Sequence, residues 1–379
     1  MKGIVVFLSL LSVHLAYGSG IRIPVTRNVQ RNAISNIHRY VLERGGANAR
    51  TINETLKDHD YMYYTGPIHI GTPPVRFMVD FDTGSDLVWV TTPDCVDDDT
   101  GGECTAQKQH YDVKNSTTGR ETKKDFEIAY ADGSYVRGKF DSDVVGVTPQ
   151  NKTGDVKKFL FGAANHESRF NTMDSDGLMG LSFPQSSSPK GSCFVQWLEK
   201  HEVFAEPRFT FWLPKDREAP GSITFGGMNE EQCGPLLTTA PVEGRTPFWQ
   251  FSISKTTVNG KEVATDSVAI SDTGSTQLLV PVAVLDAINS VHPVGAAISC
   301  DGAELKDLKI ELQVGNATLV INGVDLPIPR ATGDECEIGV NSSPMMDAFV
   351  LGDVFIRKYC QVYDYKEKSV GFAVAKDEE

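Results

Sequence analysis

Residues 77–90 read FMVDFDTGSDLVWV: an apolar stretch, an Asp-Thr-Gly-Ser turn and a second apolar stretch. The same arrangement returns at residues 268–280, which read VAISDTGSTQLLV. Farther along, each copy is followed by two apolar residues and a glycine, at 178–180 (LMG) and at 350–352 (VLG). Two unrelated turns would not share four residues and both flanks, so the sequence predicts two related halves with one such loop in each.

The repeated loops each carry one aspartate, Asp82 and Asp272. An aspartate on a tight turn between buried strands is rigid and partly desolvated, and the adjacent glycine lets backbone N–H groups approach its carboxylate. If the loops meet across a pseudo-two-fold axis, the two carboxyl groups share one proton, because carboxylates in contact cannot both ionise. One carboxylate then activates a water molecule while the other protonates a carbonyl oxygen, so the pair can hydrolyse an amide.

On these residues the chain resembles the pepsin family of aspartic proteases, from about residue 60 to residue 375. The resemblance implies a mainly β, bilobal acid protease fold with two pseudo-symmetric, β-barrel-like lobes and a few short helices. It also implies that Asp82 and Asp272 are the catalytic pair. The residues that it assigns to support of this pair are Thr83, Gly84, Ser85, Thr273, Gly274 and Ser275.

A hairpin is predicted where Phe126, Ile128 and Tyr130 alternate with polar residues and an Asp-Gly turn follows at Asp132 and Gly133. In the resemblance this hairpin is the flap that closes over substrate. Tyr130 is then the flap tyrosine, which we expect to form a hydrogen bond with Trp89. The resemblance further implies that certain residues contact a bound peptide: Asp132, Gly133, Gly84, Gly274, Ser275 and Thr276, with Leu178 lining an apolar subsite.

The N-terminal region is expected to be an export signal followed by a basic propeptide. Residues 1–18 begin with Lys2, continue as an apolar run and end in small residues, which is typical of a secretory signal. Residues 1–50 hold seven basic residues and one acidic residue, a net +6; since the whole chain is −14, the rest carries −20. A basic arm on an acidic body can be a nucleic-acid arm, a targeting segment or a propeptide. We expect a propeptide at 19–53, with a surface arm of the mature protein as the alternative.

The expected lobes are residues 54–214, with the first aspartate and the flap, and residues 215–379, with the second aspartate. Five N-x-S/T sequons suit an exported chain, and we expect some of them to be glycosylated; they begin at Asn53, Asn115, Asn151, Asn316 and Asn341. Export also favours disulfides. The resemblance implies the pairs Cys95–Cys104 and Cys300–Cys336. It does not assign Cys193, Cys233 or Cys360, and Cys193–Cys233 is only a guess.

Other kinds of site are not indicated. The acidic balance argues against nucleic acid as a partner. The sequence has no G-x-S-x-G, H-E-x-x-H or phosphate-binding loop, so we expect no metal and no cofactor. Residues 97–99 (DDD) suggest calcium, but Gly101 and Lys108 break the EF-hand pattern, and we expect a solvated loop.

The sequence therefore predicts an aspartic-type endopeptidase made as a secretory zymogen. We expect hydrolysis of peptide bonds between bulky apolar residues at acidic pH, on a peptide or protein substrate, with the propeptide as an intramolecular inhibitor. We expect a monomer without a membrane anchor, secreted or sent to a lysosome or vacuole. The alternatives are a non-catalytic, peptide-binding or inhibitor-like relative, and a structural protein assembled through the odd cysteine.

Overall fold

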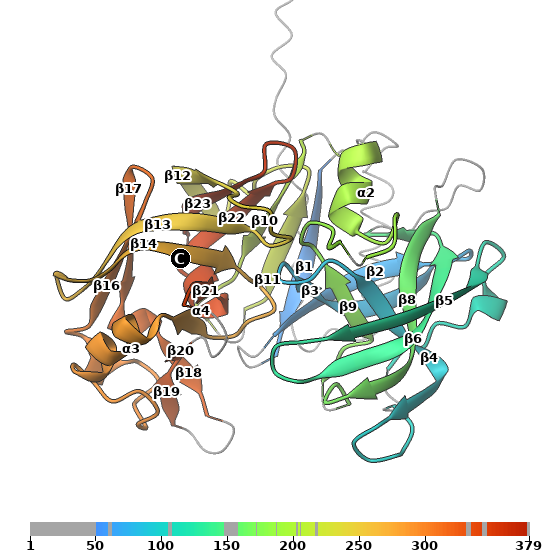
Figure 1. Ribbon diagram of the computed structural model, residues 1–379, viewed down its shortest axis with the longest axis horizontal. Coiled ribbons are helices and arrows are strands. Elements are labelled where there is room, and N and C mark those ends of the chain that lie inside the picture. The colour runs from blue at the N-terminus through green and yellow to red at the C-terminus, as the bar shows by residue number, and fades with distance from the viewer. Residues whose placement is uncertain are drawn as a thin grey trace, which may run out of the picture.

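The computed structural model describes residues 51–376, apart from 60–62, 105–107, 148–157, 172, 187, 202–203, 205, 217–218, 331–334 and 343–346. The expected signal peptide, almost all of the expected propeptide and the sequon at Asn151 lie outside the described residues. The described chain is mainly β with a few short helices, and Figure 1 shows its two lobes side by side. The prediction of a mainly β, bilobal fold is confirmed.

One large sheet contains the N-terminal lobe and the connection between the lobes. Its strands run, from edge to edge, in the order β12 (Cys233–Pro241), β23 (Ser369–Ala375), β22 (Tyr359–Asp364), β10 (Arg208–Trp212), β11 (Gly221–Phe225), β1 (Ile52–Asp58), β2 (Tyr64–Ile70), β3 (Val75–Asp82), β9 (Gly177–Gly180), β4 (Val88–Asp97), β8 (Phe159–Ser168), β6 (Tyr135–Asp143) and β5 (Arg120–Ala129), with β7 (Val145–Gly146) beside β2.

The C-terminal lobe has its own sheet, whose order is β17 (Ala317–Asn322), β16 (Lys309–Val314), β13 (Gln250–Val258), β14 (Lys261–Ser271), β21 (Phe349–Leu351), β15 (Leu278–Val280) and β20 (Val340–Ser342), and a separate pair, β18 (Pro327–Pro329) and β19 (Cys336–Ile338). The described helices are α2 (Phe194–His201), α3 (Val282–Asn289) and α4 (Asp353–Ile356), with single 3₁₀ turns at η1 (Val113–Asn115), η2 (Ala303–Leu305) and η3 (Gly323–Asp325). In the described part of the chain, no helix has the length and apolar character needed to cross a membrane.

Local sequence patterns explain these elements. In β16 every second side chain is buried (Ile310, Leu312 and Val314), which is the period of a strand with one face on the core. In α3 the buried side chains are Val284 and Ile288, four residues apart on one helical face. The helix follows Pro281, which cannot extend the preceding strand ladder.

The two halves repeat one arrangement around the Asp-Thr-Gly-Ser loops. In the first half β9 lies between the strands that flank the loop, parallel to β3 and antiparallel to β4. In the second half β21 lies in the same way, parallel to β14 and antiparallel to β15. Gly180, the last residue of β9, and Gly352, which directly follows β21, pass so close to backbone carbonyls of the loop regions that a Cβ would overlap them. This close approach explains the apolar-apolar-glycine pattern in each half.

The expected domain boundaries fall at specific places in this architecture. The proposed cut after Asn53 lies within β1, which pairs with both β11 and β2. The proposed lobe boundary after residue 214 lies in the connection between β10 and β11, which are antiparallel neighbours. Both boundaries stay predictions.

Three disulfides are present among the described residues. Cys95–Cys104 and Cys300–Cys336 are the two pairs implied by the resemblance. The guess of Cys193–Cys233 is wrong, because Cys233 pairs with Cys360. Cys233 on β12 and Cys360 on β22 lie opposite Ala375 and Ala373 of β23, which runs between those strands. Cys193 directly precedes α2 and donates its buried thiol hydrogen to the Ser182 carbonyl.

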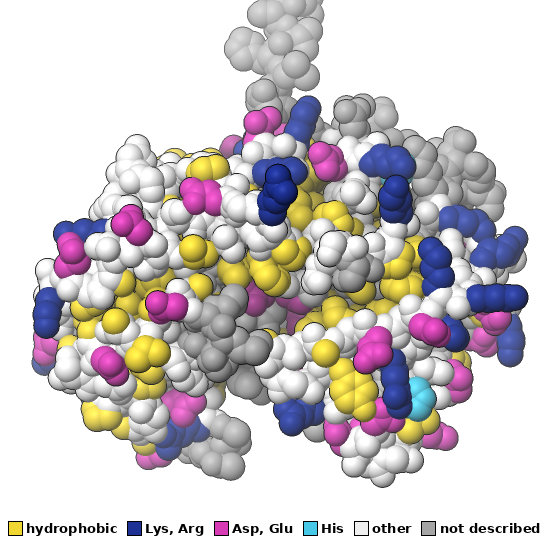
Figure 2. Space-filling view, viewed as in Figure 1, with side chains coloured by type: hydrophobic (Ala, Val, Ile, Leu, Met, Phe, Trp, Pro, Cys, Tyr) yellow, Lys and Arg dark blue, Asp and Glu magenta, His cyan; other side chains and the backbone are white. Residues whose placement is uncertain are grey.

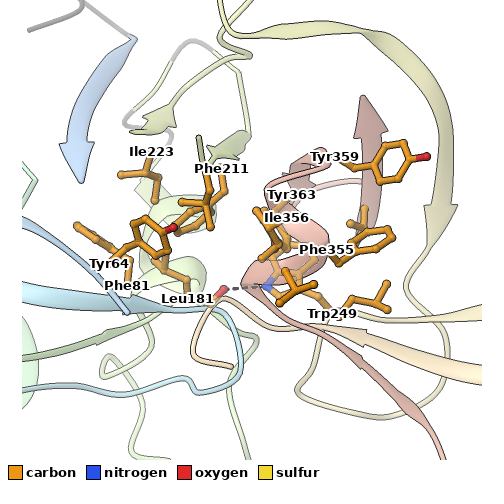
Figure 3. Packing of buried hydrophobic residues seen from close by; sticks show 14 of the residues in the cluster. Tyr64, Phe81, Leu181, Phe211, Ile223, Trp249, Phe355, Ile356, Tyr359 and Tyr363 are labelled. Carbon is orange, nitrogen blue, oxygen red and sulfur yellow. Dashed lines mark hydrogen bonds between the residues drawn. The ribbon is translucent and has the colours of Figure 1, made fainter. Parts of the chain in front are cut away.

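Buried aromatic rings fill the centre of the molecule where the lobes meet, as Figure 3 shows. Trp249 is fully buried, and its ring nitrogen donates to the Leu181 carbonyl at 2.8 Å. It packs in an edge arrangement on Phe209 and Tyr363, with ring centroids 5.8 and 5.1 Å away. The Trp249 side chain of the C-terminal lobe therefore joins Leu181, which directly follows β9 of the N-terminal lobe, to strands β10 and β22 of the large sheet.

Trp249→Phe should lower the free energy of unfolding by about 1–3 kcal/mol, because it removes buried ring volume and leaves the Leu181 carbonyl without this donor. Urea unfolding of the purified protein measures the effect. Trp197→Phe, on the half-buried face of α2, is the matched control and should cost less. An unfolding midpoint for Trp249→Phe equal to that of the unchanged protein would contradict the role given to this contact.

Candidate active site

The first loop fixes the carboxylate of Asp82 at the end of β3. Asp82 is only 5% exposed. The backbone N–H of Gly84 donates to its Oδ1 at 2.7 Å, and the hydroxyl of Ser85 donates to its Oδ2. Both carboxylate oxygens are thus held by the residues that directly follow it, so the plane of the carboxylate is set locally.

The second loop holds Asp272 with the same atoms. The N–H of Gly274 donates to Asp272 Oδ1 at 2.9 Å, and the Ser275 hydroxyl donates to Oδ2 at 2.8 Å. Asp272 is half-buried, so solvent reaches the pair from its side. The two loops are equivalent in hydrogen bonding as well as in sequence.

Two threonines lock the loops to each other. The N–H of Thr83 donates to Thr273 Oγ1, and the N–H of Thr273 donates to Thr83 Oγ1, both at 3.0 Å. Each hydroxyl then donates to a carbonyl of the opposite strand, Thr83 to Ser271 at 3.0 Å and Thr273 to Phe81 at 2.6 Å. Both threonines are buried, so these four bonds fix the distance between the loops across the lobe boundary.

The carboxyl groups of Asp82 and Asp272 are next to each other. A Cβ added to Gly84 would stand 2.5 Å from Asp272 Oδ1, and one added to Gly274 would overlap Asp82 Oδ1. Each glycine therefore makes room for the carboxylate of the other loop. Figure 2 shows acidic side chains in the hollow between the two lobes.

Burial and the neighbouring charge change the acidity of this pair. Burial chiefly, and then the negative charge of Asp272, raise the pKa of Asp82 to about 7; the hydrogen bonds from Ser85 and Gly84 act in the opposite direction. Asp82 therefore keeps its proton at pH values far above the ordinary pKa of aspartate.

Two further buried carboxyl groups lie behind the pair, and our sequence reasoning missed them. Burial, and then the charges of Asp82 and Asp272, raise the pKa of Asp80 well above its usual range. Burial also raises the pKa of Asp353, with Asp80 adding to the effect and the Arg357 guanidinium opposing it. Asp80 lies two residues before Asp82 in an apolar strand, hence on the same strand face, and this spacing was the signal available in the sequence.

The hairpin predicted from the Asp-Gly turn is formed by β5 and β6. The ring nitrogen of Trp89 donates to the Tyr130 hydroxyl at 2.8 Å, which is the expected contact. Asp132 and Gly133 are exposed at the tip, and Gly133 has φ of 85°, which a side chain would disfavour. We call residues 130–134 the flap tip.

Leu178 and Thr276 are the remaining residues that we expect to bind substrate, and this assignment stays a prediction. Leu178 belongs to a buried apolar cluster that also contains Trp89 and Phe170, with Tyr130 packed against it. The carbonyl of Thr276 accepts from the N–H of Val354 at 3.3 Å, directly after the second loop. Phe170, whose ring lies 5.5 Å from that of Tyr130, is an addition that the sequence alone did not indicate.

The acidic run Asp97, Asp98 and Asp99 is only in part the solvated loop that we expected, because Asp99 is exposed whereas Asp97 is buried and Asp98 is half-buried. Asp97 is 2% exposed and accepts hydrogen bonds from Thr100 and from Asn171, at 2.7 and 3.1 Å. Asp98 accepts hydrogen bonds from Tyr135 and Arg137 of β6, at 2.7 and 3.0 Å, so these charges have partners within the lobe.

The described sequon asparagines differ in exposure. Asn115, Asn316 and Asn341 are exposed, whereas Asn53 is half-buried in β1, where its side-chain oxygen accepts a hydrogen bond from Thr224 at 2.9 Å. The exposed three are therefore the better glycosylation candidates.

The buried carboxyl groups predict that stability falls as pH rises. Unfolded aspartate loses its proton near pH 4, whereas folded Asp82 keeps its proton to about pH 7. Between these values the folded state binds more protons, so the free energy of unfolding should decrease with pH. Urea unfolding at pH 4, 5.5 and 7 measures this slope. Asp82→Asn should make this slope shallower, because Asp80 and Asp353 still contribute to it, whereas the exposed Asp286→Asn should leave it unchanged. A stability that rises across this range would contradict the protonation assigned to Asp82.

Comparison with known proteins agrees with this geometry. Residues 63–375 match the family model described as eukaryotic aspartyl protease. The chain is 30% identical over 337 residues to pepsin-3 of Oryctolagus cuniculus, covering 85% of this chain and 83% of the relative. It is 30% identical to gastricsin of Homo sapiens (82% and 81% covered) and 29% identical to pregnancy-associated glycoprotein 2 of Bos taurus (82% and 82%). The chain belongs to the eukaryotic aspartyl protease family and has its bilobal, pepsin-like fold.

Proposed function

We propose that the protein is an aspartic endopeptidase in which Asp82 and Asp272 activate water. The observation that carries this proposal is the placement of the two carboxyl groups next to each other by matched hydrogen bonds from Gly84 and Gly274. The pair holds one shared proton in the acid range, since ionising the second carboxyl would place two negative charges in contact.

The catalytic step uses this shared proton. One carboxylate takes a proton from a water molecule lying between the pair, and the oxygen of that water forms a bond to the carbonyl carbon of the peptide. The other carboxyl gives its proton to the carbonyl oxygen, which produces a neutral tetrahedral intermediate. The first carboxyl then gives its proton to the amide nitrogen, and the C–N bond breaks. The second carboxylate takes a proton from a hydroxyl of the intermediate as the carboxylic acid product forms, which restores the starting protonation of the pair.

The substrate that suits this site is an extended peptide with bulky apolar side chains. The exposed backbone of the flap tip offers strand-like hydrogen bonds to an extended chain. The apolar cluster that contains Leu178 and Phe170 lies under the flap and suits a large apolar side chain. A non-catalytic peptide-binding protein would use the same flap and the same apolar cluster, so it is the second candidate for this fold.

Asp82→Asn and Asp272→Asn should each lower kcat for peptide hydrolysis by at least about 10²- to 10⁴-fold, because each removes one member of the acid–base pair. The measurement is cleavage of a denatured protein across acid and neutral pH, with and without a pepstatin-type inhibitor, with cleavage sites identified by mass. Wild-type activity should decline as pH rises through about 7, where Asp82 loses its proton. Unchanged hydrolysis in either variant would contradict the assignment, and an inactive wild type that still binds peptide would favour the second candidate.

We also propose that residues 19–53 are a propeptide that inhibits the site through charge. Residues 1–50 carry +6 against −20 for the rest, so acid protonates carboxylates that attract the basic segment and weakens its hold. This segment contains no lysine, so an arginine or another arrangement supplies its cationic contact with the aspartates. Secretion or delivery to a lysosome or vacuole, and glycosylation of exposed sequons, are part of the same proposal.

Purified precursor should lose a segment ending near residues 50–55 when the pH is lowered, and activity should appear with it. N-terminal sequencing and a time course of activity measure both events. The Asp82→Asn precursor is the control for self-processing, since it should remain uncut when no other protease is present. A precursor that keeps its size and stays inactive down to strongly acidic pH would contradict the propeptide assignment.

A further inference from the structure

The flap tip is supported by one short segment, residues 168–171, which we call the bracket. Its Phe170 ring packs edge-on against Trp89 and Tyr130, with centroids 5.1 and 5.5 Å away. Its Arg169 reaches the other side of the tip, where Nη1 donates to the carbonyl oxygen of Asp132 at 2.6 Å. Two consecutive residues thus contact the flap tip at two different points.

Arg169 adopts a backbone conformation that arginine rarely takes. Its φ is 67°, in the left-handed region, where a non-glycine residue costs free energy and persists only when its surroundings hold it. Its backbone N–H donates to Asp99 Oδ2 at 2.6 Å. The guanidinium lies close to the tip backbone, since a Cβ added to Gly133 would stand 3.5 Å from Nη1. Arg169 therefore links Asp99, in the acidic run of residues 97–99, directly to the flap tip.

The bracket is itself anchored to the acidic run of residues 97–99 and to Lys108. The Ser168 hydroxyl donates to Asp99 Oδ1 at 2.9 Å, and the Asn171 side chain donates to Asp97. The ammonium of Lys108, 4% exposed at its side chain, donates to the Phe170 carbonyl and to Glu167, both at 2.8 Å. Buried, charge-assisted bonds of this kind are strong, so the bracket is a firm base for the flap.

We propose that Arg169 is a positioning residue that holds the flap tip over the dyad of Asp82 and Asp272. This inference rests on the proposed function. The Arg169–Asp132 bond keeps the tip in the closed arrangement in which Tyr130 meets Trp89, so a larger fraction of molecules is ready to pair with a peptide. The affinity for substrate falls in proportion to the fraction of the binding-competent state, whereas the chemistry at the dyad is unchanged once the peptide is bound.

Arg169→Gln should raise KM for a peptide substrate, and the Kd of a pepstatin-type inhibitor, by about two- to fivefold, because the hydrogen bond that it removes is exposed and contributes less than a buried one. Its kcat should stay within about twofold, and its thermal unfolding should be nearly unchanged. Arg169→Lys should recover part of the loss, because an ammonium can still donate to the Asp132 carbonyl. Asp99→Asn should act in the same direction, since it weakens the anchor of Arg169.

Lys139→Gln is the matched control, because it removes an exposed ion pair with Asp125 on the same hairpin and leaves the bracket intact. Hydrogen exchange of residues 126–136 gives a readout that needs no activity, and it should be faster in Arg169→Gln but not in Lys139→Gln. If the wild type is inactive but shows this exchange difference, the proposed function is contradicted, whereas the support of the flap tip by Arg169 still holds. Equal exchange and equal KM in Arg169→Gln and the wild type would overturn the positioning role of Arg169. A KM change confined to peptides with acidic side chains would also overturn it, because Arg169 would then be a substrate contact.

Discussion

The hydrogen bonds between Thr83 and Thr273 are the constraint on which this structure depends. Each threonine receives the N–H of the other and donates its hydroxyl to a strand of the other lobe. A buried hydrogen bond contributes only about 1 kcal/mol to stability, but an unmatched buried group costs more, so the loops have one favourable relative position. That position holds next to each other two carboxyl groups that repel each other when both are ionised.

The surrounding architecture maintains this unfavourable contact. The inserted strands β9 and β21 pass beneath the loops at Gly180 and Gly352, and Trp249 ties one lobe to the other. Burial then raises the pKa of Asp82, and it also raises the pKa values of Asp80 and Asp353 behind it. The consequence of burying these acids is a lower stability toward neutral pH.

The sequence predicted those parts of the site that short local motifs encode. The repeated loop identified both aspartates, both glycines and the threonines and serines around them, and the Asp-Gly turn identified the flap. The Cys233–Cys360 pair and the partners of Asp97–Asp99 were not predictable in this way. Each depends on partners that are far away in the chain, such as Asn171 for Asp97, and only the folded structure brings them together.

The shared proton is the central claim, and carbon-13 NMR of carboxyl-labelled aspartates titrated against pH tests it most directly. Comparison with Asp82→Asn assigns the Asp82 signal. The account predicts that Asp82 titrates near pH 7 in the wild type and at lower pH in Asp272→Asn, because the neighbouring negative charge is then gone. Titration of Asp82 near pH 4 in both proteins would contradict the account.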